Sequence, residues 1–184
     1  IFEAKKRPSF NPLIVHVSSI SDAKKIVQFN ERAEELAASF WPGALTMVLP
    51  RLNDCGISLL VSAGLDSIAI RVPTHPLAQK LLAKTAHPIA APSANRSGEI
   101  SPTTAAHVVR SFSQISMQHN IIILDGGACE VGLESSVVDL TGEQSVLLRP
   151  GGVTSESIEA VIGELKFAAS ENCAPKSPGM LSRH

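Results

Sequence analysis

The sequence predicts an α/β fold in which helices flank an open, twisted sheet of mixed strand direction. Two observations support this prediction. In the first half of the chain, short runs rich in β-branched residues alternate with segments of helical periodicity. In the second half, strand-like runs follow one another. Alternation favours parallel strands and direct succession favours antiparallel ones, so we expect both in one sheet.

The first expected elements follow from apolar spacing. Residues 1–5 are typical of the last turn of a helix, and the β-branched run 13–17 predicts a buried strand. The pair Ser21-Asp22 provides an N-cap, and apolar residues at helical spacing extend the next helix to about Phe40. Further strands are expected at 45–49, 67–72 and 88–91, and further helices at 77–86 and 103–112.

The second half is dominated by strands. The run 121–124 is the most apolar of the expected strands and ends on Asp125-Gly126-Gly127. Two more strands are expected at 136–140 and 145–148, and Thr154 caps a last helix that runs to about Phe167. From Ser170 the chain is polar and contains prolines, which is typical of an interdomain linker.

Composition narrows the class of protein. Of the 184 residues, 44% are hydrophobic and 18% are charged, which suffices for one sizeable core. No apolar run approaches the roughly 20 residues that cross a bilayer, and no secretory signal is recognisable, so we expect no membrane association and a cytoplasmic location. Cys55, Cys129 and Cys173 lie far apart, which favours reduced thiols. The formal net charge of −1 argues against a dedicated nucleic-acid binder.

Several candidate functional residues stand at the ends of expected strands, where open α/β sheets bind their ligands. Lys5 and Arg7 precede Asn11 on a segment with two prolines and could grip a triphosphate, although basic residues also suit an ordinary helix C-terminus. His16 lies in an apolar strand, where a core role is the more frequent one. Arg71 ends an apolar strand and needs an anionic partner, and we favour a substrate carboxylate over a structural one.

Three loops carry further polar groups. Residues 92–98, followed by Ser101-Pro102-Thr103, offer small hydroxyl and amide groups before a helix start, which suits either an anion site or a plain turn and N-cap. Residues 132–136 could place a hydroxyl at a strand start, and residues 149–152 place a cation on a tight turn. We find no metal-site spacing, no P-loop and no GxSxG elbow. A cation-lined pocket of this kind fits nucleotidyl or phosphoryl transfer.

Taken together, these motifs resemble the YrdC-like family, and the similarity runs almost from end to end. Its motifs stand in the family's order: KKRPSFNPLIVH (5–16), WPGALT (41–46), IAIRVP (68–73), APSANRSG (91–98), SPT (101–103), GLESSVVD (132–139) and LRPG (148–151). The resemblance implies an L-threonylcarbamoyladenylate synthase, a nucleotidyltransferase that joins L-threonine, bicarbonate and ATP and releases pyrophosphate. Mg²⁺ shares the phosphate charge, and a tRNA-modifying transferase complex then uses the product.

The resemblance also assigns roles to single residues. It implies that Lys5, Arg7 and Arg71 are catalytic, with Arg71 as a clamp for the threonine carboxylate, and that Asn95 lies beside the threonine site. The implied ATP-binding residues are Lys5, Arg7, Asn11, Ser67, Ser93, Ser101 and Arg149. The implied threonine-binding residues are His16, Arg71, Ala91 through its backbone, and Ser135. No protein ligand for a metal is implied.

The chain departs from the family at both ends. The family's opening strand–helix–strand with its Pro-Thr-[Asp/Glu]-Thr-x-Tyr-Gly-Leu motif is missing, so we expect residues 1–169 to form an N-terminally incomplete catalytic domain. We expect residues 170–184 to be a linker toward a further C-terminal domain. The alternative from another class is a double-stranded RNA-binding module without catalysis, and a third option is a domain of a carbamoyl-transfer maturation enzyme, which shares this fold.

Overall fold

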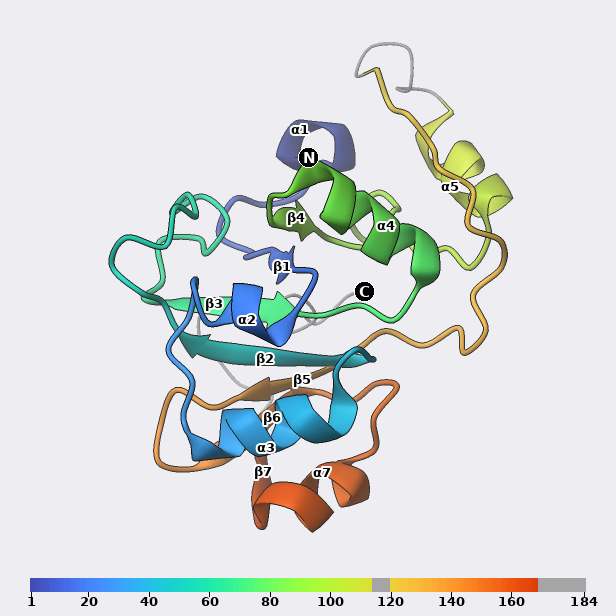
Figure 1. The fold of residues 1–184 in the computed structure, drawn as a ribbon. Coiled ribbons are helices and arrows are strands. Elements are labelled where there is room, and N and C mark those ends of the chain that lie inside the picture. The colour runs from blue at the N-terminus through green and yellow to red at the C-terminus, as the bar shows by residue number, and fades with distance from the viewer. Residues whose placement is uncertain (114–119, 169–184) are drawn as a thin grey trace.

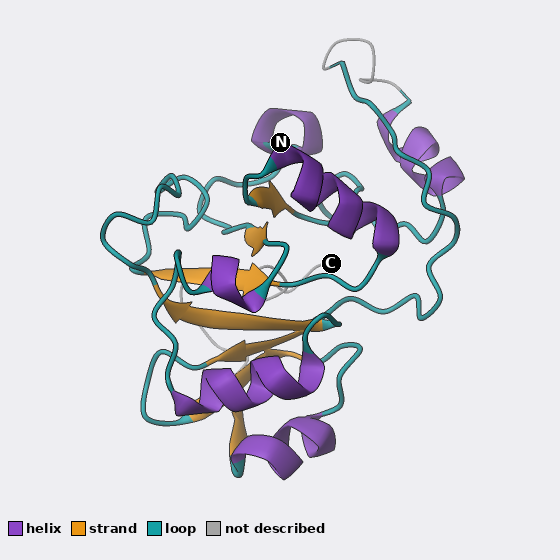
Figure 2. Ribbon diagram, in the orientation of Figure 1, coloured by secondary structure: helices purple, strands orange, loops and turns teal. Residues whose placement is uncertain are grey.

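The fold is a seven-stranded mixed sheet with helices packed against it, as the computed structural model shows for residues 1–113 and 120–168 (Figures 1 and 2). The strands are β1 (Ile14–His16), β2 (Leu45–Pro50), β3 (Ser67–Arg71), β4 (Ile89–Ala91), β5 (Ser136–Asp139), β6 (Ser145–Arg149) and β7 (Leu165–Phe167). The helices are α1 (Phe2–Lys5), α2 (Ile20–Ala23), α3 (Glu31–Phe40), α4 (Pro76–Thr85), α5 (Ala105–Phe112) and α7 (Ser155–Ile162).

Antiparallel and parallel pairs of neighbouring strands alternate across the sheet. The order is β4-β1-β3-β2-β5-β6-β7. Three neighbouring pairs are parallel, namely β1–β3, β2–β5 and β6–β7, and the pairs between them are antiparallel. The predicted mixed α/β sheet is therefore confirmed.

The main core lies between the sheet and helices α3 and α7. Leu36 of α3 and Ile158 of α7 are fully buried and share one apolar cluster with Met47 of the central strand β2. Val48, the next residue of β2, belongs to a smaller cluster with Ala69 and Val137, as expected where successive side chains point to opposite faces. Strand β2 is thus apolar on both faces, which fixes it in the middle of the sheet.

The single helix expected up to Phe40 is instead two helices. Ser19, not Ser21, caps α2 by accepting a hydrogen bond from the Asp22 N–H at 3.1 Å. Asn30 then caps α3 through a 3.0 Å bond from the Ala33 N–H. A helix N-cap has an extended backbone, so the Asn30 cap interrupts the helical run that apolar spacing alone suggests.

Two other expectations were wrong. Residues 121–124 form no strand, and Ile122 and Leu124 are 81% and 57% exposed. An apolar run becomes a strand only where a partner edge is available, and no described strand pairs with this one. The last helix ends at Gly163, whose φ of 78° stops it, and residues 165–167 pair with β6 as β7. The predicted linker 170–184 lies outside the described residues.

Among the described residues, no helix is long and apolar enough to cross a membrane.

The end of α4 provides a test of backbone strain. Exposed Ala86 ends this helix in the left-handed conformation, with φ 52° and ψ 21°. Because only glycine adopts it without a steric penalty, Ala86→Gly should raise the free energy of unfolding by about 0.5–1 kcal/mol, measured by urea denaturation. The matched control is Ala83→Gly, an exposed interior position of the same helix, which should lower it by about 1 kcal/mol. A loss of stability in both variants would contradict this account of Ala86.

Candidate functional site

The candidate site is a cavity of about 380 Å³ at one edge of the sheet, which is within the usual range for small-molecule sites. Strand register brings its walls together. Arg71 ends β3, Arg149 ends β6 and Ser135 directly precedes β5. Because β2 pairs antiparallel with β3 and parallel with β5, the end of β3 and the start of β5 lie at the same edge. Five cationic and three carboxylate side chains line the cavity.

Lys5, the last residue of α1, and Arg7, in the turn that follows, both line the cavity. Lys6 adopts the left-handed conformation there, with φ 51°, and so ends the helix between the two cations. The Lys5 Nζ donates to the carbonyl oxygens of Ser93, at 2.5 Å, and Asn95. Arg7 donates from Nε to the Asn11 carbonyl at 3.2 Å and from Nη2 to the Pro12 carbonyl at 2.7 Å. Both cations are buried, at 5% and 8% exposure.

Arg71 and His16 stand side by side on parallel strands. Register pairs them directly, and the Arg71 Nε donates to the Gly43 carbonyl at 2.8 Å. A side chain on Gly43 would collide with the Phe40 carbonyl oxygen, so this close turn requires glycine. Burial, and to a lesser degree the Arg71 charge, lower the pKa of His16 to about 4. His16 is therefore neutral near pH 7 and can accept a hydrogen bond.

The main electrostatic feature is a group of three cations that form no ion pair with a carboxylate among the described residues, of which Lys5 and Arg7 are buried and Arg71 is half-buried. The three ion pairs found among residues 1–113 and 120–168 do not include Lys5, Arg7 or Arg71. Their N–H groups donate to backbone carbonyls, which accept hydrogen bonds but carry no net charge. Burial lowers the pKa of all three, that of Lys5 to about 8, where the Arg7 charge adds to the effect. A bound anion would relieve this unfavourable charge burial.

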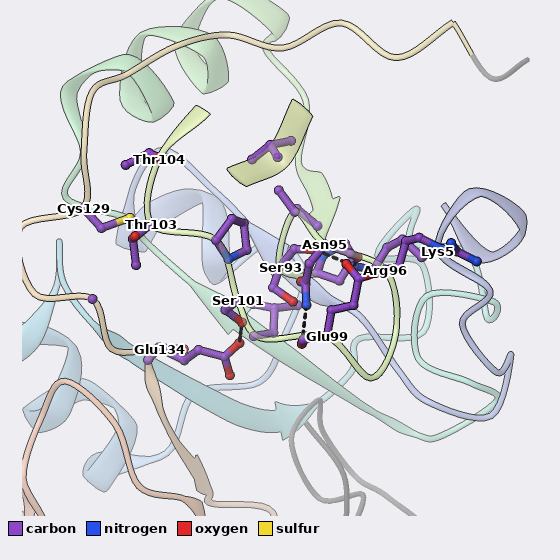
Figure 3. Close-up of a pocket in the computed structure, with 18 of the residues that line it drawn as sticks. Lys5, Ser93, Asn95, Arg96, Glu99, Ser101, Thr103, Thr104, Cys129 and Glu134 are labelled. Carbon is purple, nitrogen blue, oxygen red and sulfur yellow. Dashed lines mark hydrogen bonds between the residues drawn. The ribbon is translucent and has the colours of Figure 1, made fainter. Parts of the chain in front are cut away.

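The loop 92–104 forms another wall of the cavity and contacts Lys5 (Figure 3). Asn95 is 5% exposed, and its Nδ2 donates to the Glu99 carbonyl at 2.6 Å. Its Oδ1 is buried and has no hydrogen-bond partner in the described part of the chain. On the same loop, the Ser101 hydroxyl donates to Glu134 Oε1 at 2.6 Å. The loop thus contributes hydroxyl groups and one buried acceptor to the cavity.

Arg149 is held against the start of β5. Its Nε and Nη2 donate to the Ser135 carbonyl at 3.1 and 2.8 Å, and its Nη1 forms an ion pair with the Glu134 carboxylate. The Ser135 hydroxyl lies 2.8 Å from the Thr46 hydroxyl. A side chain on Gly151 would meet the backbone of residues 134–136 within 2.4–2.6 Å. Gly151 therefore lets the turn after β6 approach closely enough to place Arg149.

The structure brings together most of the residues predicted from the sequence. Nine of the residues expected to be catalytic or to bind a substrate line the cavity: Lys5, Arg7, His16, Arg71, Ala91, Ser93, Ser101, Ser135 and Arg149. Asn95, which was expected beside the threonine site, lines it as well. Two do not. Asn11 is buried behind Arg7 and orients it through its carbonyl, and Ser67 starts β3, at the opposite end of the strand from Arg71. Two carboxylates that line the cavity, Glu134 and Glu99, were not predicted from the sequence, although the motif GLESSVVD contains Glu134.

Comparison with known proteins gives concordant matches. A family model, Sua5_yciO_yrdC, described as telomere recombination, matches residues 1–151. The threonylcarbamoyl-AMP synthases of Pyrococcus abyssi and Bacillus subtilis are 46% and 47% identical to the chain, covering all of it and 54% and 53% of their own lengths. The chain thus spans about half the length of these curated relatives. The crystal structure of P. abyssi Sua5 complexed with L-threonine superposes with a TM-score of 0.91 at 45% identity, covering 100% of this chain and 54% of that one.

The titration of Lys5 should make anion binding depend on pH. With a pKa of about 8, its amine is charged below pH 8 and neutral above it. ATP serves as a polyphosphate probe because its phosphate charge is constant above pH 8, and its affinity should fall by up to about tenfold per pH unit above 8 until the higher pKa of the bound state is reached. Isothermal titration calorimetry from about pH 7 to pH 10 measures this. In Lys5→Arg, which stays charged, the profile should be flat.

The pH dependence of the free energy of unfolding shows whether a loss of affinity above pH 8 could instead reflect unfolding. Above pH 8 and below the ordinary lysine pKa, the unfolded chain holds more protons at Lys5 than the folded chain does. The contribution of Lys5 to the free energy of unfolding therefore rises with pH, whereas the affinity for the polyphosphate probe should fall. A wild-type affinity that stays constant across this window would contradict the role of Lys5.

Proposed function

The chain belongs to the Sua5/YciO/YrdC family, and on this premise we propose that its protein is a threonylcarbamoyl-AMP synthase acting in tRNA modification. One observation supports this most strongly. Lys5 and Arg7 are buried and Arg71 is half-buried around one cavity, and none of the three forms an ion pair with a carboxylate among the described residues. A site of this kind favours a multiply charged anion with an additional carboxylate, and ATP together with an amino acid provides both.

The proposed reaction proceeds in two steps. The threonine amine attacks the carbon of bicarbonate, water leaves, and N-carboxy-threonine forms. One oxygen of the new carboxylate then attacks the α-phosphorus of ATP, the bond to the bridging oxygen breaks, and pyrophosphate leaves with the electron pair. Catalysis of such a transfer relies on positioning and on charge stabilisation. The products are threonylcarbamoyl-AMP and pyrophosphate, and a separate transferase complex would pass the threonylcarbamoyl group to tRNA.

Each wall of the cavity suits one substrate. Lys5, Arg7 and Arg149 would stabilise the phosphates and the charge that develops on pyrophosphate. Arg71 would bind the threonine carboxylate, and neutral His16 beside it would accept a hydrogen bond from the amino acid without repelling its ammonium group. The P. abyssi relative, which was crystallised with L-threonine, supports an amino-acid subsite in this fold.

Mg²⁺ would enter as its complex with ATP. The described residues contain no group of three or more His, Cys, Asp or Glu side chains that could hold a metal ion. Five cations and several hydroxyl groups line the cavity together with three carboxylates, and the cations and hydroxyl groups suit phosphate oxygens. We therefore propose that phosphate oxygens and water hold the metal, which would share the phosphate charge.

The decisive experiment measures pyrophosphate release from ATP, with threonine and bicarbonate each present or omitted. It uses the 184-residue chain and a version extended at its N-terminus by the strand–helix–strand segment of the family. Release should require both co-substrates, and Arg7→Ala and Arg71→Ala should each lower it at least about 100-fold. Arg110→Ala, which removes an exposed arginine outside the cavity, is the matched control and should keep full activity.

The pyrophosphate assay, combined with a measurement of RNA binding, can reject the proposal. If the extended chain releases no pyrophosphate but binds double-stranded RNA with an affinity that falls steeply with salt, the synthase assignment is wrong and the RNA-binding alternative replaces it.

A further inference from the structure

Glu134 occupies an unusual place in the cavity. Its carboxylate accepts a hydrogen bond from Ser101 at 2.6 Å with one oxygen and forms an ion pair with Arg149 through the other. It thereby joins the loop 92–104 to the end of β6, and Figure 3 shows its hydrogen bond to Ser101. It is the only carboxylate in an ion pair with a cavity cation among residues 1–113 and 120–168.

The two groups that Glu134 binds are those that a phosphate would use. A hydroxyl donor and a guanidinium group are typical phosphate ligands, and a carboxylate accepts from both in the same way. The charge of Glu134 also reaches the other cations. It partly offsets the lowering of the Arg7 pKa that burial causes, and together with Glu99, whose effect is the larger, it does the same for the pKa of Lys5. The Glu134 carboxylate is thus an anion of the protein itself that binds the groups a phosphate would bind.

The surroundings indicate that Glu134 can leave while its partners remain. Its side chain is 32% exposed, whereas that of Arg149 is 13% exposed. Arg149 keeps two hydrogen bonds to the Ser135 carbonyl, at 3.1 and 2.8 Å, that do not involve Glu134. The position of Arg149 therefore does not depend on the ion pair, which argues against a purely structural role for the carboxylate.

We propose that Glu134 is a stand-in for a substrate phosphate. In the free site its carboxylate binds the Ser101 hydroxyl and the Arg149 guanidinium, and a polyphosphate displaces the carboxylate from both groups. This inference rests on the proposed function, because that function makes ATP the displacing ligand. Displacement has two consequences. Weak or singly charged anions cannot compete with the carboxylate, so the site selects polyphosphates, and Glu134 returns to Arg149 as pyrophosphate leaves.

The test is the affinity of the full chain for inorganic pyrophosphate, measured by calorimetry at neutral pH. Glu134→Gln keeps the size and the hydrogen-bonding capacity of the side chain but removes its charge. If the Glu134 carboxylate is bound to Ser101 and Arg149 in about nine-tenths of the free molecules, only about one-tenth can bind pyrophosphate directly. The Glu134→Gln variant should then bind pyrophosphate about tenfold more tightly than wild type. The matched control is Glu99→Gln, which removes another carboxylate that lines the cavity but accepts from Ser111 instead of a cation. It should tighten binding less than about threefold, through long-range charge alone.

A double variant separates displacement from a general charge effect. In an Arg149→Gln background, Glu134→Gln should no longer tighten binding, because the gain arises by releasing Arg149. A gain no larger than that of Glu99→Gln, or a gain that persists without Arg149, would overturn the inference. Weaker binding in Glu134→Gln would overturn it too, by showing that the carboxylate orients Arg149 toward the ligand.

The inference and the proposed function can fail independently. Pyrophosphate affinity needs no synthesis of threonylcarbamoyl-AMP. If wild type shows no release dependent on threonine and bicarbonate while Glu134→Gln still binds pyrophosphate more tightly, the synthase assignment fails and the stand-in remains. If synthesis occurs and Glu134→Gln gains nothing, the stand-in alone fails.

Discussion

The backbone hydrogen bonds of β2 to its two neighbours hold the walls of the cavity together. On one side β2 pairs with β3, which ends in Arg71, and on the other with β5, which follows Ser135. Both faces of β2 are buried, and a shift by one residue would exchange its apolar faces and move both walls. The precision of the site is therefore a property of the sheet register, and the loops add side chains to a frame that β2 has already set.

The cations of this frame are stabilised in a way that preserves their charge. A buried guanidinium or ammonium group needs acceptors for its N–H groups, and carboxylates would supply them at the cost of neutralising it. Here backbone carbonyls of Gly43, Pro12 and Ser93 accept instead. Carbonyl dipoles satisfy the donors while the net charge stays available to a ligand. The Arg149–Glu134 pair is the exception, and it is also the pair whose carboxylate is partly exposed.

Most of the sheet and nine residues of the cavity could be predicted from the sequence, because the loops at one end of the strands lie close together and carry the polar residues of the site. It was insufficient where structure depends on distant partners. The apolar run 121–124 has strand propensity, yet no described strand pairs with it. Residues 165–167 continue a helical pattern, yet Gly163 and the free edge of β6 make them a strand. Glu134 could not be recognised because its importance lies in contacts with residues 33 and 15 positions away.

The pairing of β2 with β5 also governs when the site can exist during synthesis of the chain. β2 is complete at Pro50, but its parallel partner begins only at Ser136, so residues 51–135, nearly half of the chain, must leave the ribosome between them. Parallel pairing over such a separation is slow, because the chain must close a long loop before any contact forms. Until then one long side of β2 remains an open, apolar edge. The nascent protein is therefore most exposed to aggregation and most dependent on chaperones just before its cavity closes.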